Sequence, residues 1–134
     1  WEFRQVIEEE LMDFCRIDLG ICGGLTEAKK VAGWCETHYI KLATHNPLGP
    51  VSTAACLHLN LASPLVGVQE QPRRPGTSLT DVIPVQVPWE AGYLLPPTAP
   101  GLGIVFDREA ARKHPFQMRE LPRLSRLDGS FTNW

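Results

Sequence analysis

The spacing of apolar residues in the first half of the chain changes repeatedly between a helical and an extended pattern. Residues 2–11 place four apolar side chains near one face of a helix, with carboxylates opposite: Phe3, Val6, Ile7 and Leu11. The next run, residues 12–17, is extended and ends at Asp18. Three glycines then predict a flexible turn, namely Gly20, Gly23 and Gly24.

A second helix and a second strand follow this turn. Apolar residues recur at i, i+3, i+4 and i+7 from Ala28 to Cys35, which predicts a helix with Thr26 as its N-cap. We expect this helix to end near His38, and residues 40–44 to form the next extended run.

A third helix and a third strand complete the pattern. The Gly49-Pro50 pair opens a helix that is apolar nearly all round, because proline is well tolerated at the first helical position. Pro64 follows the end of this helix, and residues 65–69 form an extended run that ends at Glu70. Helices between successive strands imply parallel strands joined by right-handed crossovers. The sequence therefore predicts an α/β fold.

Residues 72–134 differ in character from the first half, since they hold nine of the twelve prolines and little periodicity. Proline limits the strand-like segment 81–87 to an edge or irregular strand. Residues 107–114 predict a short helix with Asp107 as its N-cap. We expect an ordered tail laid over another part of the protein, and we divide the chain into segments 1–71 and 72–134.

Three strands with their helices make an incomplete sheet. An open sheet of three strands leaves two apolar edges uncovered. The chain also begins without a methionine, inside a helical pattern. We therefore expect a piece of a larger α/β protein, which by itself aggregates or needs a partner.

Composition and charge argue against several classes of protein. Hydrophobic residues make up 43% and charged residues 21% of the chain, and the net charge is −2 at pH 7. This balance is ordinary for a globular protein and gives no basic field for nucleic acid or anionic membranes. No apolar run approaches the roughly 20 residues that span a bilayer, and no export leader is recognisable.

The four cysteines are spaced irregularly, and fit neither a zinc site of paired cysteines nor a dense disulfide framework: Cys15, Cys22, Cys35 and Cys56. We interpret them as reduced core thiols of a cytoplasmic protein. Cys35 and His38 share one helix face, but no second pair completes a metal site.

Each of the three predicted strands ends on a chemically capable side chain, and these are Asp18, His45 and Glu70. In parallel α/β folds, functional residues gather at the carboxyl ends of strands, and neighbouring strands lie about 4.8 Å apart. A carboxylate that accepts the imidazole N–H fixes the tautomer and raises its basicity, so Asp18 would orient His45 as a base. Glu70 could donate or accept a hydrogen bond at an oxyanion if its pKa were raised.

Each of these residues also has a purely structural explanation. Asp18 precedes a glycine turn, and His45 could cap the next helix. Glu70 could pair with Arg73 or Arg74. Only the coincidence of all three at strand ends favours a functional site.

Other candidates carry weaker signals. The glycines after the first strand lack the spacing of a dinucleotide-binding loop, and no P-loop lysine follows. We interpret His58 as a satisfied core or interface histidine, and His114 as a residue that favours a helix C-terminus. Arg16 and Lys41 share strand parity with the site residues, so they would face inward and need carboxylates from elsewhere.

Three segments resemble the C-terminal half of enolase-superfamily barrels: RIDLGICGGLTEAKKVAGWCE, LATHNPLGPVSTAACLHL and VQEQ. They are most similar to the mandelate racemase branch, and within it to galactonate dehydratase and related acid-sugar dehydratases. The similarity continues through APGLGIVFDREAA to DGSFTNW, and the spacing between Asp18, His45 and Glu70 suits this group. Ile17 departs from it, because the family usually has proline there.

The resemblance implies a (β/α)7β barrel with a capping domain. Residues 12–18, 40–45 and 65–70 would be the last three barrel strands, and the tail from Pro72 would return to the capping domain. The implied partners are a small-molecule sugar acid, the N-terminal remainder of the barrel and capping domain, and further copies in a homo-oligomer.

The resemblance also implies a reaction. His45 would abstract the proton α to a carboxylate, Asp18 would support it, and Glu70 would stabilise the enolate of a Mg²⁺-dependent dehydratase. The Mg²⁺ ligands and the general acid are expected on earlier strands, so this chain alone would be inactive. The alternatives are a racemase or epimerase with the same dyad, a non-catalytic barrel fragment and, last, a nucleotide-binding α/β protein.

Overall fold

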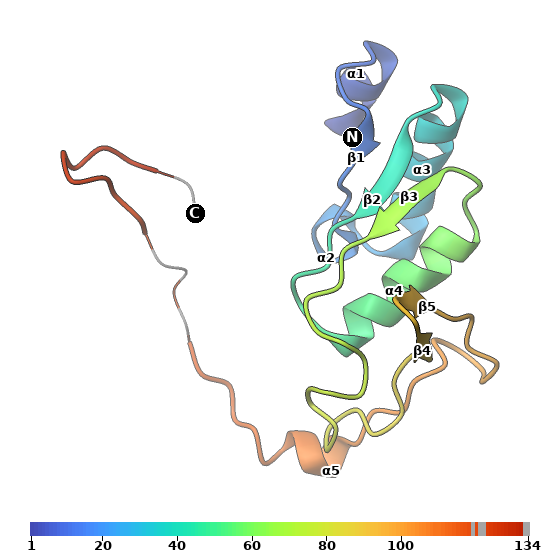
Figure 1. Ribbon diagram of the computed structural model, residues 1–134, viewed down its shortest axis with the longest axis vertical. Helices are drawn as coiled ribbons and strands as arrows, with labels where there is room; N and C mark the ends of the chain where they lie inside the picture. Colours follow the sequence, from blue (N-terminus) through green and yellow to red (C-terminus); the bar gives the residue numbers. More distant parts are fainter. Residues whose placement is uncertain (119, 121–122, 133–134) are drawn as a thin grey trace.

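The computed structural model describes residues 1–118, 120 and 123–132. Figure 1 shows three parallel strands beside two long helices, with the later part of the chain wrapped below them and then extending away. The elements in chain order are α1 (Phe3–Glu8), β1 (Phe14–Cys15), α2 (Leu19–Cys22), α3 (Leu25–Thr37), β2 (Lys41–Thr44), α4 (Pro50–Leu61), β3 (Val66–Gln69), β4 (Trp89–Glu90), β5 (Tyr93–Leu94) and α5 (Arg108–Ala111). This arrangement confirms the predicted α/β class with a parallel sheet.

The sheet has the order β1-β2-β3, so each strand lies beside its successor in the chain. The register shifts between Leu42 and Ala43, where β2 pairs with β3 through an irregularity. Asp18 and His45 form a further parallel bridge beyond the end of β1. The carboxyl ends of the strands therefore meet at one rim of the sheet.

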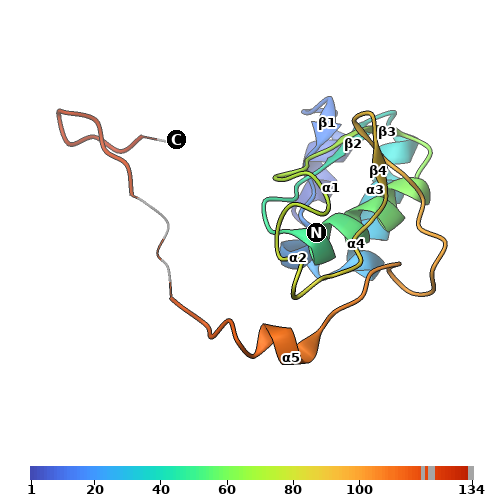
Figure 2. The same cartoon turned by 60° about the horizontal axis from the view of Figure 1, so that its bottom comes forward.

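The two faces of the sheet have opposite character. Helices α3 and α4 cover one face, where Cys15, Ile17 and Leu42 belong to the apolar core. The other face is open in Figures 1 and 2, and it carries the exposed side chains of Phe14 and Val68. A sheet with this much uncovered surface is typical of one that packs against further structure.

Several predicted boundaries need correction in the first segment. Helix α1 ends at Glu8 rather than near residue 11, because the chain reverses at Glu10, whose φ is 52°. The predicted glycine turn contains the short helix α2, and Gly23 ends it in the left-handed region. Gly24 rather than Thr26 is the N-cap of α3, since its φ of 85° lets the helix begin one residue after it. Both the end of α3 at His38 and the start of α4 at Pro50 are confirmed.

The first part of the later segment packs against α4. Val87 belongs to a second apolar cluster with Ala54 and Leu57 of α4. The predicted strand over residues 81–87 is wrong apart from Val85, which bridges Val105. Pro84 interrupts that segment and Pro88 directly follows it. The hairpin β4-β5 forms after the segment instead.

Short helix α5 carries the predicted cap, because Asp107 Oδ1 accepts hydrogen bonds from the N–H groups of Glu109 and Ala110. His114 lies just beyond the C-terminal end of α5, where its backbone N–H donates to Ala111 O at 3.0 Å, but its ring is directed to another partner. Its Nε2 lies 2.6 Å from Asp81 Oδ2, which ties the region after α5 back to an earlier loop. The division of the chain at residue 71 stays a prediction.

The cysteines and His58 can also be compared with their predicted states. All four cysteines are free thiols, and the neighbouring Cys35 thiol, together with burial, raises the pKa of Cys15. Hence Cys15 stays protonated at neutral pH. His58 is partly buried, and its Nε2 has no hydrogen-bond partner among the described residues, so a satisfied core histidine is not found and an interface histidine stays a prediction. Among the described helices, none has the length and apolarity to cross a membrane.

Candidate active site

The two carboxylate oxygens of Asp18 have different partners. Oδ1 accepts hydrogen bonds from Gly20 N–H at 2.8 Å and Ile21 N–H at 3.1 Å, which caps α2. Oδ2 lies 2.9 Å from Nδ1 of His45. Burial by itself raises the pKa of Asp18, but the hydrogen bond from His45 and the two backbone N–H groups outweigh it and lower the pKa. Asp18 is therefore an ionised acceptor at neutral pH.

His45 directly follows the end of β2, and its ring lies beside Asp18. Its backbone N–H donates to Ile17 O at 2.9 Å, which continues the parallel ladder beyond the named strands. Because the Asp18 carboxylate can only accept, Nδ1 of His45 is the donor in their contact. The neutral ring consequently keeps Nε2 free of a proton and able to accept one.

Glu70 extends the site to the third strand through a single oxygen. Glu70 Oε2 accepts hydrogen bonds from Asn46 N–H and from Arg16 Nη2, each at 2.9 Å, and lies 3.7 Å from His45 Nε2. The Asn46 N–H most of all, with the Arg16 charge beside it, lowers the pKa of Glu70 against a smaller opposing effect of burial. A raised pKa, the condition set above for a role of Glu70 at an oxyanion, is therefore not met.

The cations near Glu70 also differ from expectation. Arg16, rather than Arg73 or Arg74, is the partner of its carboxylate. Arg16 and Lys41 are exposed, so the prediction that they face inward and need carboxylates from elsewhere is wrong. The partner of Arg16 is Glu70 of this chain. The open face of the sheet allows this, because solvent reaches both side chains.

A buried polar network behind the rim was missed from the sequence. Asn46 is fully buried, and its Nδ2 donates to Thr53 Oγ1 at 2.8 Å and to the Glu70 carbonyl oxygen at 3.3 Å. Asn60, which lies in helix α4 as Thr53 does, donates from Nδ2 to Gln69 Oε1 at 2.9 Å. The available signal was the presence of Thr53 and Asn60 in a largely apolar helix, which marks positions that need buried partners.

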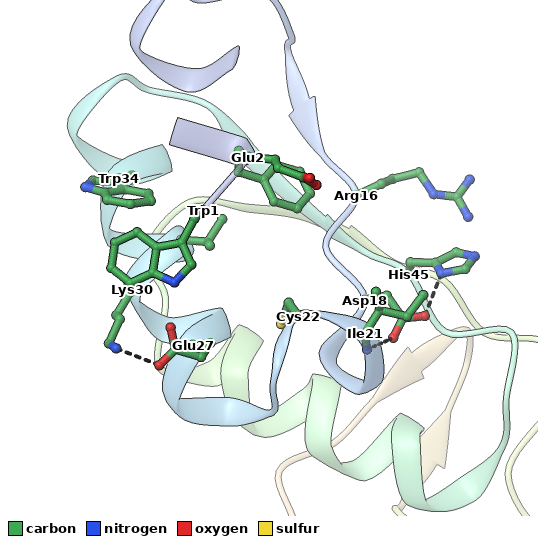
Figure 3. A pocket seen from close by; sticks show the side chains of 12 residues that line it. Trp1, Glu2, Arg16, Asp18, Ile21, Cys22, Glu27, Lys30, Trp34 and His45 are labelled. Atoms are coloured by element: carbon green, nitrogen blue, oxygen red, sulfur yellow. Dashed lines mark hydrogen bonds and ion pairs between the residues drawn. The ribbon is translucent and has the colours of Figure 1, made fainter. Parts of the chain in front are cut away.

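A cavity of about 530 Å³ opens beside the Asp18–His45 pair. Figure 3 shows Arg16, Asp18 and His45 at one end of it and two tryptophans at the other. Trp1 and Trp34 meet edge to face with ring centroids 5.8 Å apart. These tryptophans were not predicted, because residues far apart in the helical patterns gave no sign that they would meet.

The described residues do not form a metal site. They contain no group of three or more His, Cys, Asp or Glu side chains that could hold a metal ion. In the Cys35–His38 pair, His38 Nδ1 lies 2.9 Å from the Trp34 carbonyl oxygen. No metal ligand is therefore assigned to the described part of this chain.

Residues 1–111 match the family described as enolase C-terminal domain-like. The chain belongs to this family. This membership confirms the resemblance to the enolase superfamily and its mandelate racemase branch. The α/β architecture thus has the family context that the motifs predicted.

The relatives of this enolase-like chain include two named dehydratases. It is 37% identical to D-mannonate dehydratase of Caulobacter vibrioides and 35% identical to D-galactonate dehydratase of Ralstonia nicotianae. The alignments cover 100% of this chain but only 34% and 37% of those proteins. The chain therefore spans about a third of the length of the curated relatives it matches.

Solved structures agree with this placement. An enolase from Agrobacterium radiobacter with sodium and L-malate superposes with a TM-score of 0.85 at 26% identity, over 97% of this chain and 36% of its own. An enolase from Pantoea ananatis with D-gluconate and magnesium gives 0.77 at 33% identity, over 84% and 27%. In both cases the match covers only part of a longer chain.

Proposed function

We propose that this chain supplies the proton-abstracting end of a sugar-acid dehydratase, within a (β/α)7β barrel whose other strands come from outside residues 1–134. The observation that carries the proposal is the 2.9 Å contact between Asp18 Oδ2 and His45 Nδ1, which leaves Nε2 able to accept a proton on a residue that lines a cavity. The dehydratases of mannonate and galactonate among the relatives support the reaction class.

In this proposal His45 is the general base. Nε2 takes the proton from the carbon next to the substrate carboxylate, and the electron pair of that C–H bond passes into an enolate. The ionised Asp18 stabilises the imidazolium that forms. The bond to the β-hydroxyl then breaks, and the hydroxyl leaves as water with a proton from an acid outside this chain.

The proposed role of Glu70 depends on its protonation. A hydrogen bond from Glu70 to an enolate oxygen requires a proton on the carboxyl group. Arg16 and Asn46 oppose that proton while they contact Oε2. The ionised Glu70 instead places a carboxylate oxygen 3.7 Å from His45 Nε2, the nitrogen proposed to take the proton.

The remaining components of the enzyme are proposed to lie elsewhere in the protein. Coverage of about a third of the relatives leaves room for the earlier strands, the capping domain and the ligands of a divalent metal such as Mg²⁺. No step is assigned to that metal here, because the described residues do not hold it. We call this chain together with the segment that supplies the remaining strands the complete barrel.

The test is an assay of the complete barrel with Mg²⁺ on D-gluconate, D-galactonate and D-mannonate, with detection of the 2-keto-3-deoxy acid. His45→Ala should lower the rate by about 10²- to 10⁴-fold, the usual contribution of a general base. His114→Ala is the matched control, because this exposed histidine pairs with Asp81 away from the rim. An inverted carbon without keto acid would indicate a racemase or epimerase, and no reaction of any acid would refute the proposal.

A further inference from the structure

Thr53, a buried residue in the first half of α4, contacts the chain at the ends of both β2 and β3. Its Oγ1 accepts a hydrogen bond from Asn46 Nδ2 at 2.8 Å and donates one to Gln71 Oε1 at 3.2 Å. The Thr53 carbonyl oxygen accepts a third hydrogen bond, from Gln69 Nε2, at 3.0 Å. One residue of the helix therefore joins the two strand ends from behind the sheet.

The partners of the Thr53 hydroxyl are neighbours of the proposed site residues. Asn46 directly follows His45, and Gln71 directly follows Glu70. The hydroxyl itself contacts neither site residue among its described hydrogen bonds, and Thr53 is only 1% exposed. It can therefore act on the 3.7 Å separation of His45 Nε2 and Glu70 Oε2 only through the residues next to them.

Stability alone does not account for this polar layer between α4 and the sheet. Two of its buried oxygens, Asn46 Oδ1 and Asn60 Oδ1, have no hydrogen-bond partner among the described residues. Unpaired buried polar atoms cost free energy, and apolar side chains of similar size would fill the space without that cost. A network that contains unpaired atoms is explained better by a role in placing the residues that it holds.

The Asn46 amide is the link between the Thr53 hydroxyl and the Glu70 carboxylate. Its Nδ2 has two acceptors, Thr53 Oγ1 and the Glu70 carbonyl oxygen at 3.3 Å. The backbone N–H of Asn46 holds Glu70 Oε2 at 2.9 Å. Loss of the hydroxyl would remove one of the two acceptors, so the backbone that places Oε2 beside the base would be held less firmly.

We propose that Thr53 is a positioning residue, whose hydroxyl fixes the separation of the His45 ring and the Glu70 carboxylate during proton abstraction. This inference rests on the proposed function, which supplies the reaction. A displacement of about 1 Å caused by a mutation far from the chemistry can lower a rate by about 10²-fold, so a single hydroxyl behind the rim is sufficient for a measurable effect.

The test is the steady-state kinetics of the complete barrel on whichever of D-gluconate, D-galactonate and D-mannonate the parent protein dehydrates fastest. Thr53→Val keeps the shape of the side chain without the hydroxyl, and should lower kcat by about 10- to 100-fold. KM should change by less than about threefold, because the buried Thr53 side chain does not meet the substrate. Thr53→Ser keeps the hydroxyl and should restore most of kcat. Gln71→Met removes only one of the two partners and should give an intermediate loss.

Ile7→Val is the matched control for lost stability. Ile7 is fully buried in the apolar core rather than in the polar network, and this change removes one buried methylene group. It should leave kcat unchanged when all variants are assayed well below their melting temperatures. Equal kcat values of Thr53→Val and Ile7→Val would overturn the inference. So would a Thr53→Ser protein as slow as Thr53→Val, or a Gln71→Met protein as fast as the parent.

The titration of Glu70 gives a readout that does not depend on turnover. The Asn46 N–H most of all lowers the pKa of Glu70, with Arg16 and His45 as the charged groups beside it. Thr53→Val should raise this pKa toward the ordinary carboxyl value, because Asn46 is held less firmly. Carbon-13 NMR of protein labelled at the glutamate carboxyls measures it, with Glu70→Gln to assign the signal. An unchanged titration would overturn the inference.

The outcomes separate this inference from the proposed function. A Glu70 titration that shifts in Thr53→Val, in a protein that dehydrates none of the acids, would leave the positioning of Glu70 standing and remove the dehydratase. Dehydration that is as fast in Thr53→Val as in the parent protein would do the reverse.

Discussion

Asn46 holds Glu70 at two points: its backbone N–H donates to Oε2 at 2.9 Å, and its Nδ2 donates to the Glu70 carbonyl oxygen at 3.3 Å. Because Asn46 directly follows His45, these bonds join the end of β2 to the end of β3. The separation of the base from the second carboxylate is thereby set by a buried amide as well as by the sheet.

The network behind Asn46 should contribute measurably to stability. Thr53→Val keeps the shape of the side chain but removes the hydroxyl that accepts from Asn46 Nδ2 at 2.8 Å. Both groups are buried, so the variant should lower the free energy of unfolding by about 1–3 kcal/mol. Urea unfolding of the complete barrel measures this change. Thr26→Ala, at an exposed position in α3, should stay within about 0.5 kcal/mol, and equal midpoints for both variants would refute the prediction.

Two substitutions of Asp18 should separate its cap from its chemistry. Asp18→Asn keeps an Oδ1 acceptor for Gly20 and Ile21, whereas Asp18→Ala removes it and should cost about 0.5–2 kcal/mol of stability. Both remove the charged partner of His45, so both should lower kcat by about 10²- to 10⁴-fold.

The measurements are melting temperature and steady-state kinetics of the complete barrel. An Asp18→Asn protein with full activity would show that the ring needs no carboxylate partner. A melting temperature as low as that of Asp18→Ala would show that the cap depends on charge.

Stability should fall in acid because of the same carboxylates. The pKa values of Asp18 and Glu70 are lowered in the folded protein, so the unfolded chain binds these protons first as the pH decreases. Their contribution is complete above the ordinary carboxyl range, about pH 5, and is lost as the pH falls through the lowered values. Urea midpoints between about pH 3 and 7 measure the loss.

The double variant Asp18→Asn, Glu70→Gln should show a shallower decrease over this range. The double variant Glu36→Gln, Glu90→Gln, which removes two exposed carboxylates, controls for the change of net charge. A decrease as steep as that of the parent protein would place the acid sensitivity elsewhere.

Residues 1–134 on their own should self-associate. The three-stranded sheet has unpaired edges and an open face, on which Phe14 is 52% exposed. Phe14→Lys places a charge on that face and should reduce association in sedimentation experiments. Phe116→Lys, at an 85% exposed position beyond α5, should not. A monomer that unfolds cooperatively would contradict the expectation that further strands cover this face.

Local patterns in the sequence were enough to predict the order of the main elements and the three polar strand ends. Periodic apolar residues report which face of a helix or strand is buried, and Pro50 marks a helix start by its own covalent geometry. These are local signals. They sufficed to place Asp18, His45 and Glu70 at one rim, where the structure brings them together.

The contacts that these residues make depend on tertiary packing. The pairing of Glu70 with Arg16, the lowered pKa of Glu70 and its bonds to Asn46 all join different strands. The cavity between Trp1 and the rim likewise depends on how α1 packs beside the sheet. Such contacts follow from the register of strands and the packing of helices, which depend on residues far apart in the chain, so no local pattern specifies them.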